Sequence, residues 1–127
     1  MELLATAVFA ILLTLLCALF VFYGVYRKQV IGDLKADALV MKNMHIFDDI
    51  SDLHPDTLRI TVVNANGSVI FDSNADFSVM ENHEDRPEIL MAAKSGEGSG
   101  TRRSTTLDRN LFYYAIRLDN GRILRIA

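Results

Sequence analysis

Apolar residues dominate the first part of the chain, and polar residues interrupt them only later. No charged residue occurs between Leu3 and Tyr26. As an α-helix, this run rises about 36 Å at about 1.5 Å per residue, which exceeds the roughly 30 Å hydrocarbon core of a bilayer. The pattern therefore predicts a transmembrane helix within residues 1–26. A cleaved signal peptide would have a shorter apolar run of about 7–15 residues that ends at small residues. Because this run ends at Arg27 and Lys28, we expect an uncleaved signal anchor.

The next segment keeps a helical period. Side chains recur at alternating spacings of three and four residues, at Ile31, Leu34, Ala38, Met41 and His45. This narrow stripe predicts that the membrane helix continues as a stalk from Arg27 to about Asp49, within a stalk and linker region of residues 27–56. A narrow stripe needs a partner, which is either the folded domain of the same chain or the same helix of a second chain. The sequence leaves both open.

Beyond Leu58 the pattern changes to that of β-strands. Runs rich in β-branched and aromatic residues are separated by turn residues such as Asn66-Gly67 and Asn120-Gly121. We expect a turn at Asp108 to Asn110. The predicted strands are 59–63, 68–72, 101–107, 111–118 and 122–127.

One short helical pattern lies between these strands. Pro87 suits the first position of a helix, Glu88 suits its positive end, and Gly96 supplies a stop. Residues 96–100 are predicted to form a flexible turn. The side chains expected to face the sheet are Ile89, Leu90 and Ala93.

The order of the predicted elements indicates the fold class. A long helix, two strands, a connector, a short helix and three strands predict an α+β domain over residues 57–127, with a five-stranded antiparallel sheet. We expect the long helix to cover one face of the sheet. The short helix and the connector, residues 74–86, would cover the other face or its rim.

Charge and cysteine content narrow the function classes. The chain has 13 basic and 16 acidic residues and a formal net charge of −3, which argues against a nucleic-acid surface. Its single cysteine, Cys17, lies in the predicted membrane helix, so no disulfide can form within one chain.

The segment NHEDRPEI, residues 82–89, gathers side chains that enzymes use for proton transfer. Neighbouring residues of an extended connector point in opposite directions, so these side chains do not all converge. The sequence also lacks a nucleophile elbow, a zincin motif and a phosphate-binding loop. His45 and Asp49 share one helical face, but ligands this sparse rarely make a metal site. We therefore expect no enzymatic activity, no metal and no cofactor.

Four stretches resemble the extracytoplasmic sensor domain of PhoR-type sensor histidine kinases of Gram-positive bacteria, which has a PAS-like or single-Cache-like fold. They occur in the order of that family and cover most of Arg59 to Ala127. The stretches are RITVVNANGSVIFDSNAD (59–76), MENHEDRPEI (80–89), GEGSGTRRSTTL (96–107) and LFYYAIRLDNGRILRIA (111–127).

The resemblance implies the sensory input domain of a two-component receptor, which detects a signal outside the cell and relays it through the stalk and the membrane helix. A second membrane helix and the kinase domains would follow in the parent protein. The sequence lacks both. It also lacks the phosphoacceptor histidine, because His45 is followed by Ile46-Phe47 rather than by an acidic residue. We therefore interpret the chain as an N-terminal fragment. The alternative is a stand-alone single-pass protein-interaction module without a small-molecule ligand.

Related folds bind small molecules between the sheet and the connector–helix layer. By this resemblance the candidate ligand-binding residues are His83, Arg86, Tyr113 and Tyr114. A buried arginine suits an anionic ligand. In the competing interpretation, Arg86 pairs with Asp72 or Asp85 and holds the connector in place. A third possibility is a domain with no ligand pocket, which binds a partner protein or responds to the state of the membrane.

The charges flanking the membrane helix conflict with the resemblance. Arg27, Lys28 and Lys35 follow the apolar run, whereas Met1 and Glu2 precede it, so the positive-inside rule places the domain in the cytoplasm. The resemblance places it outside. We follow the resemblance and expect a cell-membrane protein with an extracytoplasmic domain, whose partners are the lipid bilayer, a small-molecule or protein signal, and a second copy bound through the stalk helix.

Overall fold

The computed structural model describes residues 1–44, 57–104 and 108–127. They form two compact units, residues 1–30 and 31–127, and the helix α1, Glu2–Asn43, contributes to both. In the first unit the side chains of residues 1–29 are exposed. Within the described residues, α1 is the one helix long and apolar enough to span a membrane. An exposed apolar surface of this extent suits lipid rather than water.

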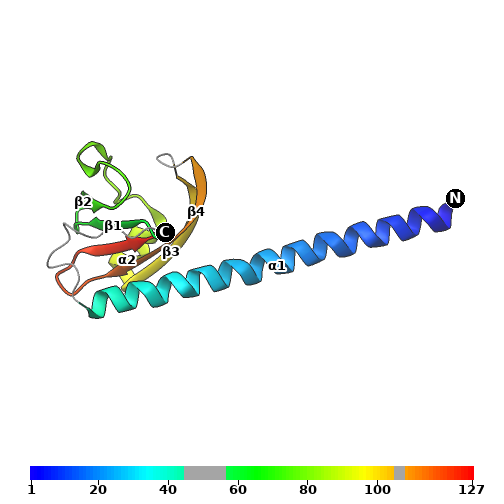
Figure 1. Ribbon diagram of the computed structural model, residues 1–127, viewed down its shortest axis with the longest axis horizontal. Coiled ribbons are helices and arrows are strands. Elements are labelled where there is room, and N and C mark those ends of the chain that lie inside the picture. Colours follow the sequence, from blue (N-terminus) through cyan, green and yellow to red (C-terminus); the bar gives the residue numbers. More distant parts are fainter. Residues whose placement is uncertain (45–56, 105–107) are drawn as a thin grey trace. The chain divides into compact units, whose positions relative to one another are not determined.

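The second unit is built on a five-stranded antiparallel sheet, as predicted (Figure 1). Its strand order is β2-β1-β5-β4-β3, so the last strand in the sequence lies in the middle of the sheet. The strands are β1, Ile60–Val63; β2, Val69–Asp72; β3, Glu97–Ser104; β4, Arg109–Arg117; and β5, Ile123–Ile126.

The predicted turn at residues 96–100 is wrong beyond its first residue. Gly96 has φ of 93° and ends the preceding helix, but β3 begins directly afterwards and pairs with β4 as far as Ser104. The glycines of this strand serve close packing rather than a turn. A Cβ added to Gly98 would lie 2.5 Å from the carbonyl oxygen of Glu88. The turn predicted at Asp108 to Asn110 is also shorter, because β4 begins at Arg109.

The helix α2, Pro87–Ser95, begins and ends where the sequence predicts, with proline in its first turn and Gly96 donating its N–H to the carbonyl of Ala92. Its predicted inward face is only partly correct. Ile89 is buried, but Leu90 and Ala93 are exposed. Glu88 and Ala92 are buried instead. Positions 88, 89 and 92 lie on one side of a helix, so they can all face the sheet. One of them is a glutamate, and a search for apolar residues at helical spacing does not identify a buried carboxylate.

A short 3₁₀ helix, η2, Phe77–Val79, lies in the connector between β2 and α2. The carboxylate of Asp76 accepts hydrogen bonds from both the N–H and the hydroxyl of Ser78 and so caps this turn. Phe77 and Val79 remain exposed, at 43% and 80%.

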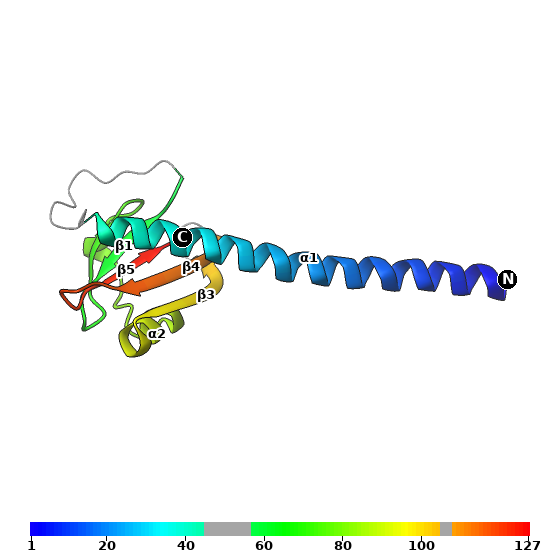
Figure 2. The same ribbon diagram turned by 90° about the horizontal axis from the view of Figure 1, so that it is seen from below.

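Side chains alternate between the two faces of the sheet, because antiparallel partners share a face. We name these faces after the helix that covers each. On the α1 face lie Ile60, Val62, Tyr114, Leu124 and Ile126. On the α2 face lie Thr61, Val63, Tyr113, Ala115 and Arg125. Figure 2 shows the last turns of α1 and the whole of α2 on opposite sides of the strands.

The stalk stripe packs on its own domain within the second unit. Leu34 and Ala38 are buried, and Ile31 and Met41 are half-buried, whereas Leu39 and Val40 remain exposed. Docking on the same chain therefore accounts for the stripe as far as Met41. The predicted end of the stalk, with His45 and Asp49, lies outside the described residues.

Candidate functional site

The α2 face carries a buried ion pair between neighbouring strands. Arg59 Nε lies 3.1 and 3.0 Å from the two carboxylate oxygens of Asp72. The same carboxylate accepts a hydrogen bond of 2.8 Å from the hydroxyl of Thr61, and the guanidinium of Arg59 also reaches the hydroxyl of Ser104 at 3.3 Å. Both charged residues are only 6% exposed. This pair is well matched in charge and geometry, as a buried pair must be to persist.

A second charged cluster, which we call the arginine pair, lies beside it. Arg102 and Arg125 place their guanidinium carbons 4.7 and 5.0 Å from the centre of the Tyr113 ring. Both face one carboxylate oxygen of Glu88, at 3.7 and 3.4 Å. Arg125 also donates to the hydroxyl of Thr61 at 3.1 Å. Two guanidinium groups therefore share one carboxylate in this cluster.

Several polar atoms of this cluster lack hydrogen-bond partners within the described part of the chain. They are the Nε atoms of Arg102 and Arg125 and the second carboxylate oxygen of Glu88. Burial lowers the pKa of Arg125 to about 10, although the charge of Glu88 acts in the opposite direction. Desolvation of the cation therefore outweighs the attraction of its neighbour.

His83 lies at the junction of the connector and the first hairpin. Its backbone N–H donates to the carbonyl of Gly67 at 2.8 Å, and the residue as a whole is 8% exposed. The Nδ1 atom has no hydrogen-bond partner among the residues that the structure describes. Burial lowers the pKa of His83, and the positive charges of Arg125 and Arg86 lower it further. Both effects favour the neutral form of the ring.

Arg86 precedes α2 and pairs with its neighbour. Its Nε lies 3.5 Å from a carboxylate oxygen of Asp85, which is a loose, exposed contact. Asp72 is engaged by Arg59 instead. Of the two acids predicted as alternatives, Arg86 is thus found beside Asp85. Arg86 and His83 both line an open cleft of about 400 Å³ on the connector.

The two tyrosines predicted for the site lie on opposite faces of the sheet. Tyr113 belongs to the arginine pair on the α2 face, whereas the Tyr114 hydroxyl donates to Glu97 on the α1 face. Lys35 of α1 binds the same carboxylate at 2.7 Å. Burial, together with the hydrogen bond to Glu97, raises the pKa of Tyr114. The structure therefore brings His83, Arg86 and Tyr113 to the α2 side of the sheet and separates Tyr114 from them.

Sequence reasoning missed the residues that dominate this face. Strand alternation alone would place Arg125 beside Thr61 once the strands were paired, but strand order is not visible in one sequence. The sequence pattern places Glu88 at the start of α2 because of its charge and does not indicate that it is buried. The pattern of residues 101–107 predicts a strand with one face in solvent, which does not indicate that Arg102 contacts Glu88; its side chain is 26% exposed.

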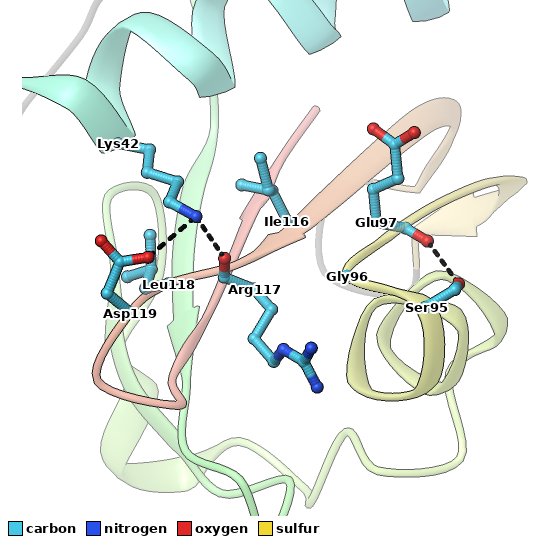
Figure 3. A pocket seen from close by; sticks show the side chains of 8 residues that line it. All are labelled: Lys42, Ser95, Gly96, Glu97, Ile116, Arg117, Leu118 and Asp119. Atoms are coloured by element: carbon cyan, nitrogen blue, oxygen red, sulfur yellow. Dashed lines mark hydrogen bonds and ion pairs between the residues drawn. The ribbon is translucent and has the colours of Figure 1, made fainter.

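A second cleft, of about 500 Å³, lies where the end of α1 meets the end of β4 (Figure 3). Lys42 points across it, with its ammonium 3.1 Å from the carbonyl oxygen of Arg117 and 3.1 Å from the carboxylate of Asp119. On the other side, the Ser95 hydroxyl bonds the carbonyl of Glu97 at 3.3 Å. The cleft thus marks a polar attachment of α1 to the sheet. No group of three metal-ligating side chains occurs in the described ranges.

Comparison with known proteins gives a family assignment. No curated protein sequence matches the chain significantly. A crystal structure of the extracellular domain of a protein described as a histidine kinase, rpHK1S-Z16, aligns with 13% sequence identity and a TM-score of 0.44. The alignment covers 67% of this chain and 35% of that one, so this chain spans about a third of the length of that structure. The model of the single Cache-like family matches residues 36–122, which include the end of α1 and most of the sheet. The chain therefore belongs to the single Cache-like family.

Proposed function

We propose that the chain is the sensory input domain of a membrane-bound histidine kinase of the two-component type. It detects a signal outside the cell and relays it through α1 to the membrane span. Membership of the single Cache-like family supports a sensory role. The observation that carries the relay is that α1 provides both the apolar span and a packed element of the folded domain.

The attachment of α1 to the sheet has an apolar part and a polar part. Leu34 and Ala38 pack against the α1 face, and Lys35 joins the carboxylate that also accepts the Tyr114 hydroxyl. In the last turn of α1, Lys42 binds the carbonyl oxygen of Arg117 at the end of β4 and the carboxylate of Asp119 in the following turn. A shift of the strands would therefore act on α1 at two points along its length, and shifts of packed helices of about 1–2 Å are an established way to switch receptors.

The proposed topology places residues 31–127 outside the cell. Its test uses single cysteines in a Cys17→Ala background, in intact cells treated with a membrane-impermeant thiol reagent. Lys94→Cys, on the exposed side of α2, should be labelled. Glu2→Cys, at the opposite end of the span, should be labelled only after lysis. Protection of position 94 in intact cells would place the domain in the cytoplasm and overturn the sensor topology.

We further propose a homodimer through the exposed side of α1. Val40 is 56% exposed, whereas Ala38, two residues away, is fully buried against the sheet. Val40→Cys, again without Cys17, should form a disulfide-linked dimer in membranes under mild oxidation, and Ala38→Cys should not. Equal absence of cross-linking at both positions would contradict a dimer that uses this surface.

A protein-interaction module without a small ligand is the second candidate. The exposed Phe77 and Val79 of η2 favour it, because apolar side chains adjacent on a surface often mark a contact region. Phe77→Ser with Val79→Ser should abolish signalling under this alternative. In the small-molecule sensor the same pair of substitutions should leave the response to the ligand intact.

A further inference from the structure

We propose that Arg117 couples the ends of α2 and α1, so that a displacement of α2 is passed to α1 around the end of β4. The two helices cover opposite faces of the sheet, so a change in one needs a route to the other (Figure 2). The inference deepens the proposed function and rests on it in one respect, because α1 is taken as the element that relays the signal. It names the residue through which α2 acts on that element.

The first argument is that Arg117 holds the end of α2 with two groups. Its Nη1 donates to the carbonyl oxygen of Ala93 at 2.9 Å, and its backbone N–H donates to the carbonyl oxygen of Gly96 at 2.8 Å. The last four carbonyls of a helix have no partner within the helix, and the helix dipole favours a cation at that end. Ala93 supplies one of these carbonyls, since α2 ends at Ser95. The end of α2 is therefore bonded both to the side chain and to the backbone of one strand residue.

The second argument is that α1 holds the remaining backbone polar group of the same residue. The carbonyl oxygen of Arg117 accepts a hydrogen bond of 3.1 Å from the ammonium of Lys42, which lies in the last turn of α1. The same ammonium lies 3.1 Å from the carboxylate of Asp119. In Figure 3, Lys42 approaches the strand from the side of α1, whereas the side chain of Arg117 extends away from it. One residue thus connects the ends of both helices through bonds that leave it in different directions.

The third argument is that the backbone of Arg117 is held firmly by its neighbours. Ile116 and Leu118 are 6% and 7% exposed, and Arg117 itself pairs with Ile123 of β5. Strand alternation turns Ile116 toward the α1 face and the side chain of Arg117 toward the α2 face. A short and rigid connection passes on a helix shift of about 1–2 Å, which a flexible loop would absorb.

The competing interpretation is that the two contacts are independent, so that Arg117 only caps α2 and Lys42 only anchors α1. Independent contacts have additive effects, and each effect stays in its own helix. Coupled contacts act on both helices, and the coupling has the same size in both directions. Measurements on the two helix ends therefore distinguish the two interpretations.

The test is hydrogen exchange of the full chain in lipid nanodiscs, measured by mass spectrometry at the last turn of each helix, with β5 as the reference. Arg117→Met removes the bond to Ala93 but leaves the backbone bonds in place. Exchange in residues 40–43 of α1 should become at least about fivefold faster, which is the lower end of ordinary coupling between sites. Lys94→Met is the matched control, because it removes an exposed cation from the last turn of α2 and should leave α1 unchanged.

The reverse experiment removes the contact from α1. Lys42→Met should accelerate exchange at the end of α2, residues 92–96, by a similar factor. Asp119→Asn is its control, because Lys42 then keeps the carbonyl of Arg117, and it should change α2 much less. When Lys42→Met is combined with Arg117→Met, exchange at each helix end should be no faster than in the faster single variant.

An unchanged rate at the end of α1 in Arg117→Met, or multiplication of the two effects in the double variant, would overturn the proposal. If Arg117→Met exposes the reference strand to exchange, Arg117→Gln replaces it, because glutamine keeps a hydrogen-bond donor. It should give the same pattern with a smaller change, and a change confined to α2 would again overturn the proposal. These measurements need no signal, so their failure would leave the labelling test of the sensor topology unaffected. Labelling that places the domain in the cytoplasm would leave the coupling unaffected in turn.

Discussion

The buried side chains of the α1 face are aliphatic or aromatic, whereas the α2 face buries the Arg59–Asp72 pair and the carboxylate of Glu88 beside the arginine pair. On the α1 face, Ile60, Val62, Leu124 and Ile126 are fully buried without any charge among them. On the α2 face an apolar cluster of Val63, Ile89, Ala92, Ala115 and Ile123 occupies only one part. The remainder is the Arg59–Asp72 pair and the arginine pair with Glu88.

The two faces of this small domain are therefore stabilised by different interactions. Burial of apolar area is non-directional, and it tolerates small shifts of α1 along the sheet. Buried ion pairs are directional, and they are net stabilising only while every partner stays in place. We therefore expect removal of one charged group to disturb the α2 face more than removal of one apolar side chain disturbs the α1 face.

The largest expected effect comes from breaking the matched ion pair of the α2 face. Asp72→Ala leaves Arg59 buried without its carboxylate, so we expect a loss of about 3–5 kcal/mol in the free energy of unfolding. Urea unfolding of the chain in nanodiscs, followed by tyrosine fluorescence, measures it. Arg103→Gln is the control, because the Arg103–Asp108 pair is exposed and its loss should cost under about 1 kcal/mol. Equal effects of the two substitutions would contradict the comparison of the faces.

The second prediction concerns the α1 face. Leu34 is 6% exposed, so Leu34→Ala should cost about 2–4 kcal/mol through lost burial and a residual cavity. Leu39→Ala, at a position 38% exposed, should cost much less. The same unfolding experiment compares them. If both substitutions had the same small effect, α1 would not be a packed part of the domain in solution.

A third prediction tests the close approach of α2 to β3. Gly98→Ala places a Cβ 2.5 Å from both the Glu88 carbonyl oxygen and the Met91 Cβ, so the helix must move away from the strand. We expect a loss of about 1–3 kcal/mol. Gly32→Ala is matched in chemistry but meets nothing within 4 Å, and it should stabilise α1 by about 0.5–1 kcal/mol. A neutral Gly98→Ala would show that the α2 face is loosely packed.

The smallest expected effect is the pH dependence that His83 contributes. Its pKa in the folded state is lowered from the ordinary value of 6.5 by burial and by Arg125 and Arg86. The unfolded state therefore binds more protons below pH 6.5, so stability is full above that pH and declines as the pH falls toward the lowered pKa. The slope contributed by one such group is at most about 1.4 kcal/mol per pH unit.

Unfolding at pH 7.5 and pH 5.5, in the wild type and in His83→Asn, measures this contribution. The variant should lose less stability between these two values. The comparison cancels the effects of His45 and His54, which are the same in both proteins. An identical pH response of the two proteins would show that the ring is not protected from protonation.

The sequence was most informative where local rules decide the structure. The apolar run, the hairpin at Asn66-Gly67, and the Pro87 and Gly96 boundaries of α2 follow from residue chemistry at one place in the chain. The predicted fold class and the five antiparallel strands are confirmed by the sheet. The glycines of β3 were misleading, since glycine permits both a turn and a close packing contact. The close approach of α2 to β3 shows that the glycine at position 98 serves packing, and this approach is not visible in the sequence.

The candidate site was harder to predict because it is assembled across the sheet. Glu88, Arg102 and Arg125 come from α2, β3 and β5, and their proximity depends on the strand order β2-β1-β5-β4-β3. Tyr113 and Tyr114 are adjacent in the sequence, so the sequence places both in one site. Side chains of neighbouring strand residues point to opposite faces of the sheet, so the two tyrosines lie apart. The ligand-binding role of His83 and Arg86 remains a prediction.

The central place of β5 also determines when the domain can fold. The hairpin of β1 and β2 and the hairpin of β3 and β4 are each local in sequence, but β5 alone pairs with both β1 and β4. Until residues 123–126 are available to pair, the two hairpins have no common neighbour. Such non-local pairing slows folding. Before β5 pairs, the chain can therefore form at most two separate hairpins, and the charged α2 face has no continuous sheet to lie on.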